Sequence, residues 1–142
     1  MNISIAKSLS KIVDCFPIMV QLRTTLTQEE FIERVKTQQK NGYNLAFLKD
    51  KGKVVAVSGF RISHCLAWGK FLYLDDLVTD SDNRSKGYGD KLFNYLIEYA
   101  KKKGCREFHL DSGVQIFPAH RFYLKKNMNI SCHHFVLPIS NN

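Results

Sequence analysis

Near the N-terminus, the spacing of hydrophobic and polar residues predicts one strand followed by two helices. The strand covers Asn2 to Lys7, where isoleucines alternate with polar residues. The first helix is indicated by apolar residues at helical spacing, namely Ile12, Val13, Phe16 and Val20. Pro17 lies inside this pattern and is expected to kink or interrupt the helix.

The second helix has a start signal and an end signal. Thr27 and Glu30 form a capping box at its N-terminus, and Asn41-Gly42 is expected to end it.

From Tyr43 onward the pattern becomes that of a β-meander. Two β-rich runs, Tyr43 to Lys49 and Lys53 to Ile62, are separated by Asp50-Lys51-Gly52, which is a hairpin signal. Phe71 to Thr79 is a third, strongly apolar run. The sequence therefore predicts three consecutive strands in this region.

The last third of the chain predicts two helices and two strands. A long helix carries one apolar stripe, formed by Leu92, Phe93, Leu96, Ile97 and Ala100, and ends in the lysines and glycine of 101–104. Glu107 to Ser112 is expected to be a strand, Phe117 to Lys126 a short helix, and Asn129 to Leu137 a final strand. The order β, α, α, β, β, β, α, β, α, β predicts an α/β (α+β) fold with a mixed sheet covered on both faces.

Length and composition indicate one cytosolic domain. The 142 residues are 44% hydrophobic, so a single domain over 1–142 can bury a substantial core. No apolar run reaches eighteen residues and the N-terminus lacks signal-peptide features, so we expect a cytoplasmic protein that does not span a membrane. Four scattered cysteines without a Cys-x-x-Cys pair are interpreted as reduced thiols that mostly fill the core. The net charge of +8 favours an anionic partner: nucleic acid, a membrane surface or a phosphate-bearing cofactor.

The segment from Leu77 to Gly89 carries the clearest chemical signal. An apolar strand runs through a polar loop into a helix start, where unpaired N–H groups and the helix dipole favour an anion. Gly87 and Gly89 allow close approach of the backbone to phosphate oxygens, and Arg84 and Lys86 add positive charge. The pattern lacks the third glycine of a Rossmann fingerprint and the Gly-Lys-Ser/Thr of a Walker A loop. A simple turn before a helix is the alternative interpretation.

The pattern Arg84-x-x-Gly87-x-Gly89 after an apolar strand resembles the pyrophosphate loop of the GNAT (GCN5-related) N-acetyltransferases, and of their small bacterial and polyamine-type members in particular. The element order is similar to the GNAT fold, with its mostly antiparallel sheet. This resemblance implies an acetyl-CoA-dependent N-acetyltransferase. It also implies a set of cofactor-binding residues: Leu77, Val78 and Thr79 along the pantetheine, and Arg84, Ser85, Lys86, Gly87, Tyr88 and Gly89 around the pyrophosphate.

A second landmark of the family lies in 119–126, which looks like the helix whose tyrosine protonates the departing thiolate. Tyr123 occupies that position. A phenol with a pKa near 10 is able to make this transfer once the geometry is right. The alternative is an amphipathic core aromatic.

Five positions depart from the family pattern. Its usual proline in the loop is Ser81, the glycine after the arginine is Ser85, and the asparagine before the final helix is Ile116. The usual Gly-Phe after that helix reads Asn127-Met128. None of these changes removes a backbone N–H that the phosphates need.

Asp75 and Asp76 are the candidates for handling the acceptor amine, which must lose a proton before it attacks. Adjacent strand residues face opposite sides unless the strand bulges, so one carboxylate or both reach the site. The pair followed by Leu77-Val78 resembles the polyamine acetyltransferase branch; solvated or loop-anchoring residues are the alternative. His133-His134 is interpreted as ordinary strand sequence, with a substrate contact or a proton relay as the alternative, and no metal site is expected.

The predicted reaction is direct attack of the amine on the thioester in a ternary complex, without a cysteine intermediate. The acceptor stays open between a small amine or polyamine and a peptide or protein amine. A non-catalytic acyl-CoA-binding regulatory module is a rival hypothesis. A basic nucleic-acid-binding domain is a second rival, but no binding motif supports it, so no nucleic-acid partner is expected. The oligomeric state stays open, with a homodimer as one alternative.

Overall fold

The computed structural model describes residues 1–140 and divides into two compact units. The first unit is Met1–Leu110, and the second begins at Asp111. The last two positions of the predicted 1–142 domain lie outside the described residues.

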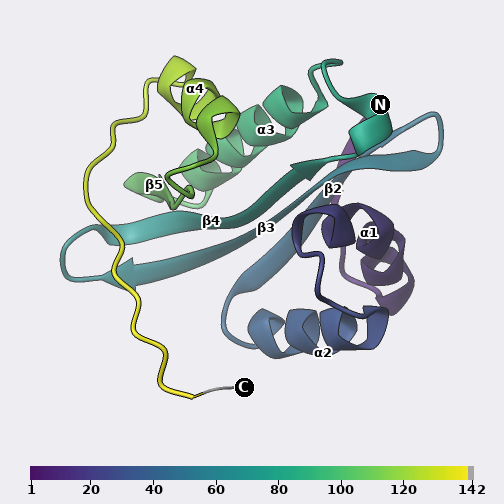
Figure 1. Cartoon of the computed structure of the whole chain (residues 1–142), viewed down its shortest axis with the longest axis horizontal. Helices are drawn as coiled ribbons and strands as arrows, with labels where there is room; N and C mark the ends of the chain where they lie inside the picture. The colour runs from purple at the N-terminus through teal and green to yellow at the C-terminus, as the bar shows by residue number, and fades with distance from the viewer. Residues whose placement is uncertain (141–142) are drawn as a thin grey trace. The chain divides into compact units, whose positions relative to one another are not determined.

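A five-stranded sheet in the order β1-β2-β3-β4-β5 forms the centre of the first unit (Figure 1). Its strands are β1 Asn2–Ile5, β2 Tyr43–Asp50, β3 Lys53–Cys65, β4 Gly69–Thr79 and β5 Glu107–Leu110. The first four strands pair antiparallel in sequence, and β5 pairs parallel with β4. This arrangement confirms the predicted mixed, mostly antiparallel sheet, although β5 ends two residues earlier than expected.

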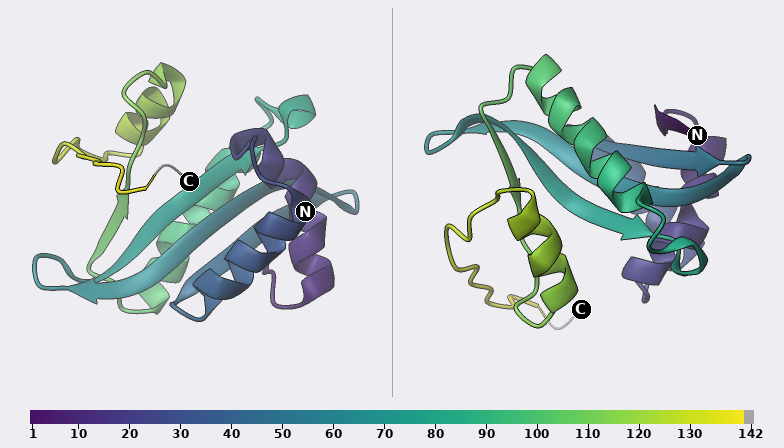
Figure 2. Two further views of the ribbon diagram at one scale, coloured as in Figure 1. Left: turned by 60° about the horizontal axis from the view of Figure 1, so that its bottom comes forward. Right: turned by 90° about the horizontal axis from the view of Figure 1, so that it is seen from above.

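Three helices cover the two faces of this sheet. α1 Leu9–Leu22 and α2 Gln28–Gln39 lie on one face and α3 Tyr88–Lys102 on the other (Figure 2). The predicted capping box is present: the Thr27 hydroxyl accepts from the Glu30 amide, and the Glu30 carboxylate accepts from the Thr27 amide. A 3-10 turn, η1 Ser81–Asn83, precedes α3. Within residues 1–140, no helix combines the length and the apolar composition needed to cross a membrane.

The expected interruption of the first helix at Pro17 is wrong, because α1 runs through this residue without a break. A proline inside a helix costs about 3 kcal/mol. Four side chains of α1 are buried, namely Ile12, Cys15, Ile18 and Met19. Each large apolar side chain contributes about 1.5–3 kcal/mol when it leaves water, so burial of this face outweighs the proline.

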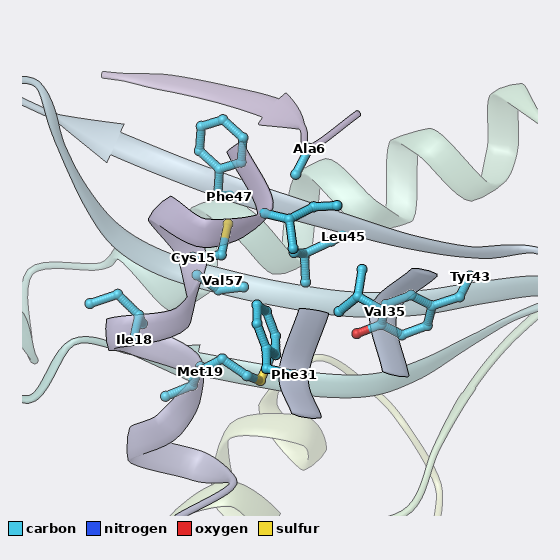
Figure 3. Close-up of a cluster of buried hydrophobic side chains, with 12 residues drawn as sticks. Ala6, Cys15, Ile18, Met19, Phe31, Val35, Tyr43, Leu45, Phe47 and Val57 are labelled. Atoms are coloured by element: carbon cyan, nitrogen blue, oxygen red, sulfur yellow. The ribbon is translucent and has the colours of Figure 1, made fainter. Parts of the chain in front are cut away.

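The main hydrophobic core lies between α1, α2 and the sheet (Figure 3). Phe31 and Val35 of α2 meet Leu45 of β2 and Val57 of β3 there. Cys15 is completely buried in this cluster, whereas Cys65 and Cys132 are exposed and Cys105 is half-buried, so the expectation that the cysteines mostly fill the core is wrong. On the other side of the sheet, α3 buries Leu92, Phe93 and Leu96. The site residues of the first unit are therefore carried by a packed scaffold.

The second unit contains the predicted helix, α4 Phe117–Lys125, but not the predicted final strand. Residues 129–140 form no strand, and apolar side chains such as Ile130, Phe135 and Val136 remain exposed. An alternating pattern becomes a strand only where a neighbouring backbone supplies hydrogen bonds, and none is paired with this segment among the described residues. The interpretation of His133-His134 as strand residues is wrong for the same reason.

Candidate active site

The loop between β4 and α3, residues 80–89, presents free backbone amides at a helix start. The first hydrogen bond into α3 runs from the Lys91 amide to the Gly87 carbonyl, at 3.0 Å. The amides of Tyr88 and Gly89 precede this bond and therefore have no partner within the helix. This geometry fits a diphosphate group, because unpaired amides and the positive end of the helix dipole face the same place.

Gly87 leaves the approach to these amides open. Its backbone is left-handed, with φ of 79°, which favours glycine, and a Cβ built there would meet no atom within 4 Å. At Gly89 a Cβ would lie 3.1 Å from the Thr79 hydroxyl, so this residue lets the first turn of α3 pack against the end of β4. A larger side chain at either position would occupy space at the helix start.

A side chain from α1 braces this loop. Gln21 donates from Nε2 to Asp80 Oδ1 at 2.9 Å, and its Oε1 accepts from the Ser81 amide at 2.9 Å. Asp80 also accepts from Asn83 at 2.8 Å, and the bonds from Gln21 and Asn83 lower the pKa of its carboxyl. Lys86 donates to Asn83 at 3.0 Å. The chain of contacts links α1 to the predicted cofactor-binding residues.

Sequence reasoning missed Gln21, although position 81 carried a signal. The family's usual proline has no N–H, whereas Ser81 donates its amide to Gln21. The departure from the family pattern thus coincides with an additional bond. The separation of 60 residues kept the partner hidden.

Replacing Gln21 with alanine is expected to weaken acetyl-CoA binding, because two bonds worth about 1 kcal/mol each no longer order the loop. We expect the calorimetric Kd to rise about tenfold while the fold is retained. Gln28→Ala, at an exposed position that starts α2, is the matched control and should leave Kd unchanged. An unchanged Kd for Gln21→Ala would exclude this bracing role.

Tyr88 fastens the start of α3 to the β2–β3 hairpin. Its buried phenol donates to Asp50, and this bond lowers the pKa of the Asp50 carboxyl. The side chain is therefore engaged inside the protein. Any contribution of Tyr88 to the cofactor comes from its backbone amide.

Two positions where the family usually has glycine keep the left-handed backbone here. Ser85 has φ of 65° and Asn127, just after α4, has φ of 63°. Asparagine tolerates this conformation better than serine does. Both turns are thus preserved despite the substitutions.

β4 has a free edge beyond its contact with β5. The parallel pairing ends at Leu74 opposite Leu110, so within residues 1–140 the segment Asp75 to Thr79 is paired only on its β3 side. Unpaired backbone at such an edge is able to bind an extended ligand like an added strand. The side chain of Val78 belongs to the core, so its predicted contact with pantetheine is confined to the backbone.

The strand bulges at the acidic pair. Asp76 lies opposite Gly59 and Leu74 opposite Phe60, which leaves Asp75 as an extra residue in β4. A bulge redirects side chains locally. Both carboxylate residues line one pocket, so the bulge that the sequence reasoning had considered is present and brings them together.

Asp76 is held by groups from α1 and β2. Arg23, at the end of α1, donates from Nε to Asp76 Oδ1 at 2.8 Å, and the Tyr43 hydroxyl donates to Oδ2 at 2.9 Å. Burial, and then the Asp76 charge, raise the pKa of Tyr43 well above its ordinary value. A Cβ at Gly59 would fall 1.8 Å from the Tyr43 oxygen, so only glycine leaves room for this pair.

Asp75 makes a separate ion pair. Arg61 of β3 donates to both of its carboxylate oxygens at 2.9 Å. Burial raises the pKa of the Asp75 carboxyl, and the Arg61 bonds act in the opposite direction. Neither arginine was expected from the sequence, because each lies in a different element from its carboxylate.

The pocket beside this pair has a volume of about 210 Å³. Arg23, Arg34 and Gln38 line it from the helical side, and Tyr43, Asp75 and Asp76 line it from the sheet. Apolar residues of α1 and α2 complete the wall. We call it the mixed-charge pocket.

Tyr123 lies on α4 in the second unit, apart in sequence from the acidic pair. It is half-buried, and burial raises the pKa of its phenol. A raised pKa keeps the hydroxyl protonated at neutral pH, as an acid requires. Its role as the acid stays a prediction from the family motif.

Cys15 and His134 have defined surroundings, one in each unit. Burial raises the pKa of Cys15 to about 12, which makes this thiol inert. His134 contacts Asp111 at 2.9 Å. Among residues 1–140, no group of three or more His, Cys, Asp or Glu side chains is placed to hold a metal ion.

Comparison with known proteins identifies the family. The acetyltransferase (GNAT) family matches residues 9–128. The N-acetyltransferase YhdJ of Bacillus subtilis is 38% identical over 114 residues, which cover 80% of each protein. The glucosamine 6-phosphate N-acetyltransferase of Arabidopsis thaliana is 28% identical over 109 residues, covering 69% of this chain and 71% of that protein.

The fold is also similar to that of a solved structure. The ribosomal-protein-alanine N-acetyltransferase of Brucella melitensis superposes with a TM-score of 0.83 over 98% of this chain and 100% of that one, at 14% identity. The chain therefore belongs to the acetyltransferase (GNAT) family and is an acetyl-CoA-dependent N-acetyltransferase.

Proposed function

We propose that the protein acetylates the primary amine of a small molecule, bound in the mixed-charge pocket beside the acidic pair. The main support for this proposal is that Asp76 and its hydrogen-bond partner Tyr43 line a pocket of about 210 Å³ next to the free edge of β4. A pocket of this size accommodates a small amine more readily than a folded protein segment. The relatives' names cover both kinds of acceptor, an amino sugar phosphate and a protein alanine.

The 80–89 loop and the β4 edge would hold acetyl-CoA. In this proposal the amides of residues 84–89 bind the pyrophosphate, Arg84 and Lys86 add positive charge, and 77–79 pair with pantetheine through their backbone. The bound co-substrate supplies the activated acyl group as a thioester. The amides at the end of β4 polarise its carbonyl oxygen.

Asp76 would bind the acceptor as an ammonium ion and help to remove its proton. The Arg23 pair with Asp76 is half-exposed on the arginine side, so an incoming ammonium is able to replace it. The neutral amine then attacks the acyl carbon while the bond to sulfur breaks, and its nitrogen loses one further proton to water as the amide forms. Tyr123 donates its proton to the leaving thiolate and is reprotonated from water. The reaction takes place in a ternary complex without an acyl-cysteine.

Asp76→Asn tests the acceptor site. Loss of the charged hydrogen bond to the amine, worth about 1.5–3 kcal/mol, should raise the amine KM at least about tenfold. Thiol release with acetyl-CoA and an amine panel measures this effect, and Asp14→Asn, at an exposed position of α1, is the charge-matched control. Unchanged amine kinetics would remove Asp76 from the site.

A further inference from the structure

The mixed-charge pocket contains charges of both signs, which limits the amines that it would favour. Asp75 and Asp76 line it from β4, Arg23 from the end of α1, and Arg34 from α2. A site selective for a polyamine needs carboxylates that are free of protein cations, because each additional ammonium must find a partner.

The two carboxylates already have cationic partners. Asp76 is paired with Arg23 at 2.8 Å and Asp75 with Arg61 at 2.9 Å. Their side chains are 13% and 20% exposed, so little carboxylate surface remains for further cations. One ammonium is able to replace the half-exposed Arg23, but a second ammonium would meet the positive charge of Arg34. The acidic pair therefore does not make a polycation site.

Arg34 is the loosely held charge of this pocket. Its side chain is 65% exposed, and its guanidinium reaches Glu30 one turn away only at 3.9 Å. An exposed pair of this kind gives way easily to a better ligand. The planar guanidinium suits the oxygens of a carboxylate or phosphate, which it binds through two parallel hydrogen bonds. Gln38, four residues further along α2, lies on the same face and also lines the pocket.

We propose that the acceptor is an amine that also carries an anionic oxygen group, either a carboxylate or a phosphate. Asp76 binds its ammonium, and Arg34 with Gln38 binds its anion. Displacement of Arg23 from Asp76 leaves a second guanidinium to face the anion. This inference rests on the proposed function, because it assigns the acceptor of the same pocket.

Matched pairs of amines provide the test. Thiol release from acetyl-CoA is measured with phosphoethanolamine and ethanolamine, with β-alanine and propylamine, and with spermidine as a polycation. We expect kcat/KM for the better anionic amine to exceed that of its neutral partner at least about tenfold. The two pairs distinguish a phosphate from a carboxylate. Calorimetric binding of each amine to the protein saturated with coenzyme A supplies a readout independent of turnover.

Arg34→Gln should bring the anionic-to-neutral ratio close to one in both kinetics and binding. Lys36→Gln removes the same charge from an exposed position of α2 outside the pocket and should retain the wild-type ratio. Preference for spermidine or for the neutral amines, or a ratio unaffected by Arg34→Gln, would overturn this inference while leaving the proposed function intact. Absence of thiol release and of binding with all five amines would overturn both.

Discussion

Tyr123→Phe is expected to lower kcat by about 100-fold, the usual contribution of a positioned acid to proton transfer. The phenylalanine keeps the ring that packs in the second unit but has no proton to give to the leaving thiolate. The affinity for acetyl-CoA, measured by calorimetry, should change by less than about a factor of two, because the interaction acts in the transition state.

The control for this experiment is Tyr95→Phe, which removes a phenol hydroxyl from the partly buried Tyr95 of α3. It should retain the wild-type rate. Because burial raises the pKa of Tyr123, ionisation of this residue should reduce wild-type kcat only above about pH 10. A Tyr123→Phe enzyme with an unchanged rate would remove this residue from the acid role.

Gly87→Leu is expected to abolish acetyl-CoA binding, with an increase in Kd of about 100-fold or more, because the side chain would fill the approach to the helix-start amides. A Cβ at this position meets no protein atom, so the added side chain competes with the ligand and not with the core. A leucine at φ of 79° strains the backbone and should cost about 1–3 kcal/mol of stability.

Gly104→Leu separates this strain from the effect on the ligand. Gly104 has φ of 77° and an equally open Cβ position, but it follows the opposite end of α3. Both variants should lose similar stability in thermal unfolding, while only Gly87→Leu should lose acetyl-CoA affinity. Normal affinity in a folded Gly87→Leu protein would contradict the binding role of the loop.

The sequence predicted those elements whose signals are local. The capping box at Thr27, the hairpin turn at 50–52 and the helix that starts after Gly87 all depend on residues close in the chain. The prediction of a final strand was wrong because a strand forms only beside a partner backbone, and a pattern of side chains does not reveal that partner. The interruption expected at Pro17 is absent because the free-energy cost of a proline inside the helix is smaller than the free energy gained by burying the apolar face of α1.

The partners within the candidate site were beyond local reasoning. Arg23 meets Asp76 across 53 residues of sequence, and Gln21 reaches Ser81 across 60. The sequence identified the acidic pair but not the arginines that neutralise it. This compensation shifts the expected acceptor away from polyamines, and it follows only from the fold that brings α1 and β3 beside the bulge in β4.

A crystal structure of the protein grown with coenzyme A would show where the cofactor binds. We expect diphosphate oxygens within hydrogen-bonding distance of amides in 84–89, with the pantetheine arm along the free edge of β4. A nucleotide bound elsewhere on the chain, with these amides facing solvent, would contradict this expectation.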